Sequence, residues 1–281
     1  QCAGHGHGVR PEDCWHGYFG AEGTDRTHID LPPSQRDFIA QVLALNKPTA
    51  IFVLNGGSVA LAPELAAPNA AVVEAFYPGA AGAEALARHL YGDANLWGRM
   101  PYTMYPAAWV DSHSMLEHDV AATNRTYRYG APAIVPFGFG LSYSSWRLRR
   151  AAPPAAAAEL ATDGSSADLN VTLTLTNDGP LAGDAVVTAY LAPRATVALQ
   201  PRPVRSLFDF ARARDVAVGA SATITFAVNA RSLLLVATSG DRVAAPGEYA
   251  LSFELGDGAT SEAMEVKLVG PQVVVEAWPG S

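Results

Sequence analysis

The side chains best suited to acid–base chemistry gather near the N-terminus. Glu22, Asp25 and Arg26 lie in the segment EGTDR. Gly23, next to Glu22, gives the backbone the freedom that a loop-borne acid requires. A carboxyl group that keeps its proton near the working pH can act as a general acid. From the residues alone, a solvated loop glutamate and a local Asp25–Arg26 brace are the more common roles.

Four histidines accompany Glu22, namely His5, His7, His16 and His28. A His/Glu metal site requires convergent ligands, which this spacing does not show. The GHGHG stretch resembles a flexible low-complexity tract, so we expect no metal. Gly56-Gly57-Ser58 follows an apolar run but lacks the patterns of phosphate-binding loops. We therefore predict no cofactor.

Composition limits the classes of protein that remain. The chain has 281 residues, 49% hydrophobic and 16% charged, which is typical of globular domains with real cores. A net charge of −8 argues against nucleic acid or an anionic membrane as a partner. No apolar run approaches the roughly 20 residues that a membrane helix needs. The start at Gln1, with no visible signal peptide, is expected of a processed terminus or a fragment.

Cysteines and glycosylation sequons bear on the compartment. Cys2 and Cys14 could form a disulfide in a secreted protein, or remain two free thiols. The sequons at Asn124 and Asn170 permit glycosylation, but such triplets also arise by chance. These residues therefore do not decide whether the protein is secreted.

The first half of the chain has the pattern of an α/β layer. Residues 34–46 predict a helix, with Ser34 as N-cap and an apolar stripe of Phe38, Ile39, Val42 and Leu45. Residues 49–54 and 71–76 are apolar runs expected in buried parallel strands. Residues 82–91 predict a second helix. This order with short loops indicates a doubly wound α/β layer.

The second half changes class. An Ala/Pro-rich stretch at 151–167 is typical of a linker. Alternating apolar and polar residues then predict strands at 169–175, 185–191, 223–228 and 249–255. Short strands separated by Gly, Pro and Asn turns indicate an antiparallel β-sandwich.

Four motifs in fixed order resemble a known family. They are EGTDR with Leu31-Pro32 and Gln35, the segment 76–106 (FYPGAAGAEALARHLYGDANLWGRMPYTMYP), RTYRY with PFGFGLSY, and the strands from Val171 to Phe226. Together they resemble the C-terminal half of glycoside hydrolase family 3. The residues of these motifs are most similar to those of the plant and fungal β-xylosidase branch, with β-glucosidases next. The chain departs from the family pattern at Leu96-Trp97, Ala83 and Asn124.

The resemblance implies a domain order. An irregular segment 1–20 precedes a truncated, partial α/β sandwich domain at 21–146. A linker at 147–167, an all-β fibronectin type III-like sandwich at 168–269 and a tail at 270–281 follow. The family places a (β/α)8 barrel before these domains, and residues 1–21 are too few to hold one. We therefore expect the exposed strands 49–54 and 71–76 to make the isolated chain poorly soluble.

The resemblance also implies an activity. It indicates a secreted, retaining exo-β-glycosidase that removes terminal xylose or glucose from oligo- or polysaccharides of the xylan type. Glu22 matches the acid/base position, with Asp25 and Arg26 near the sugar. The nucleophilic aspartate belongs to the barrel, so we expect the chain alone to be inactive. The alternative is a non-catalytic relic that binds carbohydrate or protein.

Aromatic residues at 127–129 and 137–143 have two interpretations. They could form a surface on which sugar rings stack. Such residues more often pack a long loop onto its domain, and we favour packing.

Overall fold

The computed structural model describes residues 18, 26–114, 116–130, 132–151, 158–257 and 261–279. The chain divides into two compact units, each continuous in space but not in sequence. The first, called the α/β unit, comprises Gln1–Ala83, Tyr102–His118 and Pro132–Pro136. The second, called the sandwich unit, comprises Glu84–Pro101, Asp119–Ala131 and Phe137–Ser281. The predicted order of an α/β region followed by an all-β region is confirmed.

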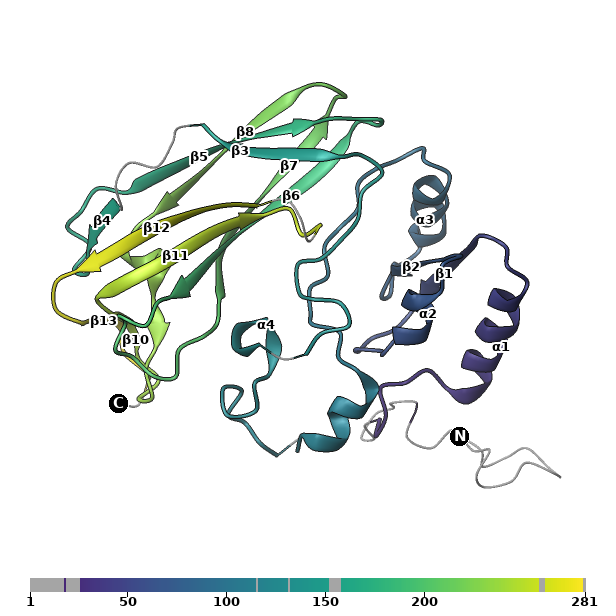
Figure 1. The fold of residues 1–281 in the computed structure, drawn as a ribbon, viewed down its shortest axis with the longest axis horizontal. Coiled ribbons are helices and arrows are strands. Elements are labelled where there is room, and N and C mark those ends of the chain that lie inside the picture. The colour runs from purple at the N-terminus through teal and green to yellow at the C-terminus, as the bar shows by residue number, and fades with distance from the viewer. Residues whose placement is uncertain are drawn as a thin grey trace. The chain divides into compact units, whose positions relative to one another are not determined.

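The α/β unit is built on two short parallel strands (Figure 1). Helix α1 (Pro33–Ala44) leads into β1 (Thr49–Val53), and helix α2 (Ala62–Ala66) leads into β2 (Ala70–Glu74). β1 and β2 pair in parallel, with Ile51 opposite Val72. A 3₁₀ helix, η2 (Ala107–Ser112), belongs to the same unit. The two strands and the first helix are those that the sequence predicts, whereas α2 is additional.

One expectation for the first helix is wrong. Pro32, not Ser34, is the N-cap, and no side chain caps the helix. A proline at the first helical position loses no helical hydrogen bond and already has a helical φ, so the helix begins at Pro33. The apolar stripe of this helix is largely exposed, since Phe38 is 67% exposed and Leu45 is 68% exposed.

β1 and β2 pair in parallel as predicted, but they are not buried as apolar runs of this kind usually are, and the exposed edge expected of the isolated chain is present. Only Val53 of β1 is buried, and every residue of β2 is half-buried or exposed. In the described part of the chain, β1 and β2 form a sheet of two strands, so each strand has an unpaired edge. A sheet this narrow cannot enclose its own side chains, which explains the exposure.

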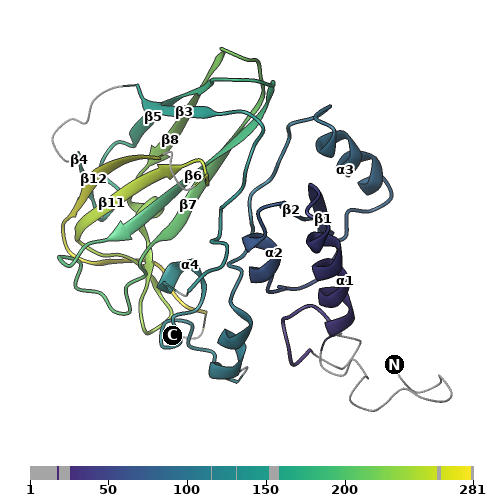
Figure 2. The same cartoon turned by 45° about the vertical axis from the view of Figure 1, so that its right-hand side comes forward.

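The sandwich unit contains most of the strands. They are β3 (Trp146–Arg150), β4 (Ala158–Ala161), β5 (Leu169–Asn177), β6 (Gly183–Pro193), β7 (Ser206–Val216), β8 (Ser221–Val228), β9 (Leu235–Val236), β10 (Arg242–Ala244), β11 (Gly247–Glu254), β12 (Ser261–Val269) and β13 (Val273–Glu276). One sheet has the order β3-β5-β8 and a second has the order β4-β12-β11-β6-β7. These two sheets are the layers of the sandwich (Figure 2). A small third sheet has the order β13-β10-β9.

Helices in the sandwich unit are short. Helix α3 (Gly82–Leu90) lies mostly in this unit, which also holds α4 (Thr126–Tyr129) and the 3₁₀ helix η3 (Ala230–Leu233). Asn229 caps η3 by accepting from the backbone N–H groups of Arg231 and Ser232. No helix in the described part of the chain is long and apolar enough to cross a membrane.

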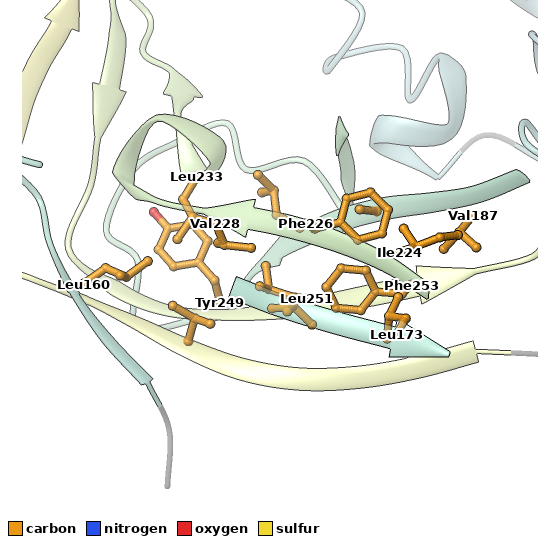
Figure 3. Close-up of a cluster of buried hydrophobic side chains, with 14 of the residues drawn as sticks. Leu160, Leu173, Val187, Ile224, Phe226, Val228, Leu233, Tyr249, Leu251 and Phe253 are labelled. Atoms are coloured by element: carbon orange, nitrogen blue, oxygen red, sulfur yellow. The ribbon is translucent and has the colours of Figure 1, made fainter. Parts of the chain in front are cut away.

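Alternating residues form the core between the two larger sheets. On β5, Val171, Leu173 and Leu175 are buried, and the threonines between them are partly exposed. Figure 3 shows how side chains from both sheets meet, with Phe226 of β8 and Phe253 of β11 side by side. Their ring centroids are 5.3 Å apart. The strict alternation in the sequence therefore corresponds to inward and outward faces.

The predicted linker and tail are corrected. Residues 147–150 belong to β3, which pairs with β5, and residues 158–161 form β4, which pairs with β12. The sandwich therefore begins at Trp146, since this residue and Leu148 alternate with outward arginines and fill the core. The predicted tail 270–281 contains β13, which pairs with β10.

Candidate functional site

The end of the EGTDR motif is anchored to the loop that follows β1. Arg26 donates from Nη2 to the carbonyl oxygen of Ser58 over 3.0 Å. The backbone N–H of Ala60 donates to Ile29 over 2.7 Å, and Asp30 forms a parallel bridge with Ala60. The chain segment just after Glu22 and Asp25 therefore lies at the carboxyl end of β1. In open α/β sheets, this edge is where ligands bind.

Two glycines in this loop permit close approaches. A Cβ on Gly57 would lie 2.7 Å from Nη2 of Arg26, and one on Gly56 would lie 3.0 Å from the ring of Tyr77. Asn55 closes the loop by donating from Nδ2 to the carbonyl of Gly57 over 2.8 Å. The Gly-Gly pair is a turn, as predicted, and its lack of side chains makes room for a guanidinium and an aromatic ring.

A cavity of about 590 Å³ opens beside Arg26. Its lining includes Tyr18, Tyr77, Asp30 and Asn55, together with apolar residues of α1, of β1 and of the loops beside them. Cavities of this size with a few convergent polar groups are typical of small-ligand sites. Aromatic, cationic and amide residues in such a lining suit a polyhydroxylated ligand.

A half-buried carboxyl group, that of Glu74, lies at the end of β2. Tyr102 donates its phenolic hydrogen to Oε2 of Glu74 over 3.0 Å. Burial raises the pKa of the Glu74 carboxyl, and the hydrogen bond from Tyr102 opposes this shift. Burial, followed by the neighbouring Glu74, raises the pKa of the Tyr102 phenol. Glu74 does not line the cavity, so the pair braces the end of β2 rather than facing a ligand.

Of the predicted site residues, the structure places only Arg26. Glu22 and Asp25 lie outside the described residues, as do Cys2, Cys14 and three of the four histidines. The fourth, His28, stacks on Tyr18 with ring centroids 5.1 Å apart. Among the described residues, no group of three or more His, Cys, Asp or Glu side chains could hold a metal ion.

Comparison with known proteins assigns both regions. Residues 10–143 match the glycosyl hydrolase family 3 C-terminal domain, and residues 185–254 match the fibronectin type III-like domain. The chain belongs to glycoside hydrolase family 3. It is 32% identical to the exo-1,4-β-xylosidase bxlB of Emericella nidulans over 92% of its own length and 35% of that protein's. This family 3 chain thus spans about a third of the curated relatives that it matches.

Solved structures agree with this assignment. The family 3 exo-β-xylosidase XlnD, in complex with a xylobiose aziridine probe, aligns with a TM-score of 0.80 and 25% identity. The alignment covers 92% of this chain and 36% of XlnD. The Bifidobacterium adolescentis β-glucosidase aligns with a TM-score of 0.72 and 27% identity, covering 88% of this chain and 37% of that one. The relatives are therefore glycoside hydrolases of both kinds.

The longest family 3 motif, residues 76–106, is largely a scaffold. Asn95 is buried, and its Oδ1 accepts from Oγ of Ser142 over 3.0 Å and from the N–H of Tyr143 over 3.2 Å. A Cβ on Gly183 would lie 2.5 Å from the carbonyl oxygen of Asn95. Asn95 thus joins the PFGFGLSY segment to β6 within the sandwich unit.

Arg99 extends this scaffold to the β11–β12 connection. Its Nε donates to the carbonyl of Leu255 over 2.7 Å. Burial lowers the pKa of the Arg99 guanidinium, and the nearby Asp257 opposes the shift. A Cβ on Gly140 would lie 2.6 Å from the carbonyl of Gly98, which explains the need for glycine there. The guanidinium therefore serves as a half-buried cross-brace.

The aromatic motif packs, as we favoured. Tyr127 stacks on Phe137 with centroids 4.3 Å apart and meets Tyr190 edge-on at 6.0 Å. Arg205 lies 4.3 Å above the ring of Tyr190 and pairs with Glu254 over 2.9 Å. Tyr143 donates its hydroxyl to the carbonyl of His89 over 2.7 Å. Tyr127 and Phe137 thus pack against β6, and Tyr143 is held to α3.

Sequence reasoning missed Asn55, which lines the cavity, and Glu74, which does not line it but interacts with Asn55. Asn55 lies just beyond β1 and Glu74 is the last residue of β2, and polar side chains at the carboxyl end of a parallel sheet are a known signal of a site. Glu74 interrupts the apolar run of β2 and was absorbed into the predicted strand 71–76. The charge in that run was the signal that could have identified it.

Proposed function

We propose that this chain supplies the acid/base half of a secreted, retaining exo-β-glycosidase. The enzyme would remove terminal β-linked xylose, or glucose, from xylan-type oligo- and polysaccharides. One observation carries the proposal. The chain aligns over 92% of its length with an exo-1,4-β-xylosidase, and other relatives of similar identity are also named xylosidases.

Glu22 is the proposed acid/base. In the first step it protonates the glycosidic oxygen while an aspartate attacks the anomeric carbon, which releases the leaving sugar and forms a glycosyl ester. In the second step Glu22 takes a proton from water, and the water oxygen displaces the aspartate with overall retention. The aspartate belongs to a preceding (β/α)8 domain, which the family resemblance implies and which is the proposed partner of this chain.

Arg26 is the proposed link between Glu22 and the cavity. Its hydrogen bond to Ser58 holds the segment that follows Glu22 at the carboxyl end of β1. The cavity beside Arg26, with Tyr77 and Asn55 in its wall, would accept the sugar on the leaving side. Asp25, next to Arg26 in the sequence, would help to orient the loop.

The first test uses the chain as it is. We expect no turnover of p-nitrophenyl β-D-xyloside or β-D-glucoside, because one of the two carboxyl groups is absent. Robust release of p-nitrophenol by the purified chain, with the expected mass and no contaminating glycosidase, would contradict this half of the proposal.

The second test replaces the C-terminal third of Emericella nidulans bxlB with this chain. We expect the chimera to hydrolyse xylobiose and Glu22→Gln to lower kcat on it by roughly 10²–10⁴-fold. With a 2,4-dinitrophenyl xyloside, the dinitrophenolate leaves without being protonated. The glycosyl ester should therefore form both in the chimera and in its Glu22 variant. Azide should then accelerate turnover in the Glu22→Ala variant and yield β-xylosyl azide.

Glu84→Gln is the matched control, since Glu84 is an exposed glutamate on α3. A chimera that folds and is active but is indifferent to Glu22→Gln would refute the assigned role. A folded but inactive chimera would favour the non-catalytic relic.

A further inference from the structure

The small sheet at the end of the sandwich carries an exposed aromatic platform. Trp278 follows β13, is 58% exposed and donates its backbone N–H to Oδ1 of Asp241 over 2.8 Å. A Cβ on Gly240 would lie 3.0 Å from Cγ and Cδ2 of the indole. One part of the ring therefore rests on the bare backbone of the β9–β10 turn, and much of the rest faces solvent.

The neighbours of Trp278 include an exposed row across the small sheet. Arg242 pairs with Glu276 across one side of β10 and with Val236 across the other, so these three residues share one face. Val274 is not part of this row, because the register shifts between Val274 and Glu276 and Val274 lies opposite the buried Val243. Trp278 is exposed two residues beyond the end of β13. We call the row and the neighbouring indole the Trp278 face (Val236, Arg242, Glu276 and Trp278).

Charge on this face is balanced. Glu276 accepts from Nη1 of Arg242 over 2.8 Å and from Nη1 of Arg231 over 3.4 Å. Asp241 supplies a second carboxylate, which also accepts from the hydroxyl of Ser239 over 2.7 Å. Two guanidinium groups face two carboxylates, so the surface favours a neutral ligand over an anion. Each guanidinium has five N–H donors, of which one is used for Glu276.

We propose that the Trp278 face is a binding surface for a neutral β-linked polysaccharide such as xylan. A pyranose ring presents a face of C–H groups that suits a flat indole, while its equatorial hydroxyls suit the surrounding guanidinium and carboxylate groups. The choice of xylan rests on the proposed function. Such a surface would hold the polymer without taking part in bond cleavage.

Affinity electrophoresis of the full chain in native gels with soluble arabinoxylan tests this surface. We expect xylan to retard the wild-type chain and dextran to leave it unaffected. Trp278→Ala should weaken the apparent affinity for xylan by at least about tenfold. Trp278→Phe, which keeps a flat ring, should retain most of the retardation.

Phe210→Ala is the matched control, because Phe210 is exposed to a similar degree on β7. Thermal unfolding of each variant checks the fold, and Trp278→Leu replaces the alanine variant should that one fail to fold. Three results would overturn the proposal: no retardation of the wild type, equal retardation by dextran, or equal effects of the Trp278 and Phe210 substitutions. Hydrolysis is not measured, so this outcome is independent of the test on Glu22.

Discussion

The two units differ in how completely they enclose their apolar side chains. The core cluster, which runs from Trp146 to Leu268, belongs entirely to the sandwich unit. In the α/β unit, by contrast, Phe38, Leu54 and Tyr77 are largely exposed. One region therefore has a core of its own, while the other presents apolar helix and strand faces.

The residues that stabilise the fold and the residues of the candidate site lie in different units. The sandwich unit holds the motif residues Asn95, Arg99 and Tyr127, whose contacts are structural. The α/β unit holds Arg26 and the cavity. Sequence motifs of one family thus serve two purposes, and only the less enclosed unit carries the candidate site.

The largest expected effect comes from the sandwich core. Phe253→Ala removes a fully buried ring that packs on Phe226, and we expect it to lower the free energy of unfolding by about 3–5 kcal/mol. Phe38→Ala on α1 removes an exposed ring and should change the free energy of unfolding by less than about 0.5 kcal/mol. Urea denaturation followed by circular dichroism compares the two. Similar losses would show that α1 is covered by other parts of the protein.

A smaller effect is expected at the buried amide. Asn95→Ala leaves the hydroxyl of Ser142 and the N–H of Tyr143 without their acceptor, at a cost of about 1–3 kcal/mol. Asn69→Ala is the control from the α/β unit, where the amide is half-buried and donates to Lys47 and Leu43. We expect Asn69→Ala to have the weaker effect in the same denaturation assay. The reverse order would contradict the division between the units.

Gly57→Ala tests the contact between the β1 loop and Arg26. The new Cβ would displace the flexible end of Arg26 and break its bond to Ser58, which should cost about 0.5–1.5 kcal/mol. Gly57→Ala and Arg26→Ala both remove the same hydrogen bond, from Arg26 to Ser58. Their effects on stability should therefore be strongly non-additive in a double-mutant cycle. Additive losses would mean that Gly57 is required for another reason.

The smallest effect concerns pH. The pKa of the Glu74 carboxyl is higher in the folded than in the unfolded protein. The folded protein therefore loses stability as the pH rises and this carboxyl ionises. Glu74→Gln keeps an acceptor for Tyr102 but removes the titration. Its stability relative to wild type should therefore increase from pH 4 to pH 7. Asp37→Asn, on the exposed side of α1, is the control, and a parallel increase there would indicate a general charge effect.

Strands were predictable where alternation was long. The runs at 169–175 and 249–255 lie within β5 and β11 or one residue beyond, because a buried apolar residue stands at every second position of both strands. β3 was missed although Trp146 and Leu148 alternate with arginines, because the Ala/Pro stretch beside it suggested a linker. Short strands depend on their partner for stability, and a single sequence does not show the partner.

The candidate site was only partly predictable. The EGTDR motif identified Arg26, but its partner Ser58 lies 32 residues away on another loop. The apolar stripe of α1 predicted a helix correctly, yet periodicity says only which residues share a face. It does not say what covers that face, and Phe38 is in fact 67% exposed.

The Asn95–Gly183 contact has a consequence for protein engineering. A fibronectin-like module cut at the start of the matched domain, residue 185, would lose β3 and β5 from one sheet. A cut at Trp146 would still remove Asn95 and Arg99, whose bonds reach β6 and the β11–β12 connection. A transplantable cassette therefore has to carry residues 84–101, 119–131 and 137–145 with it, so recombination boundaries drawn from domain names would pass through the middle of the unit.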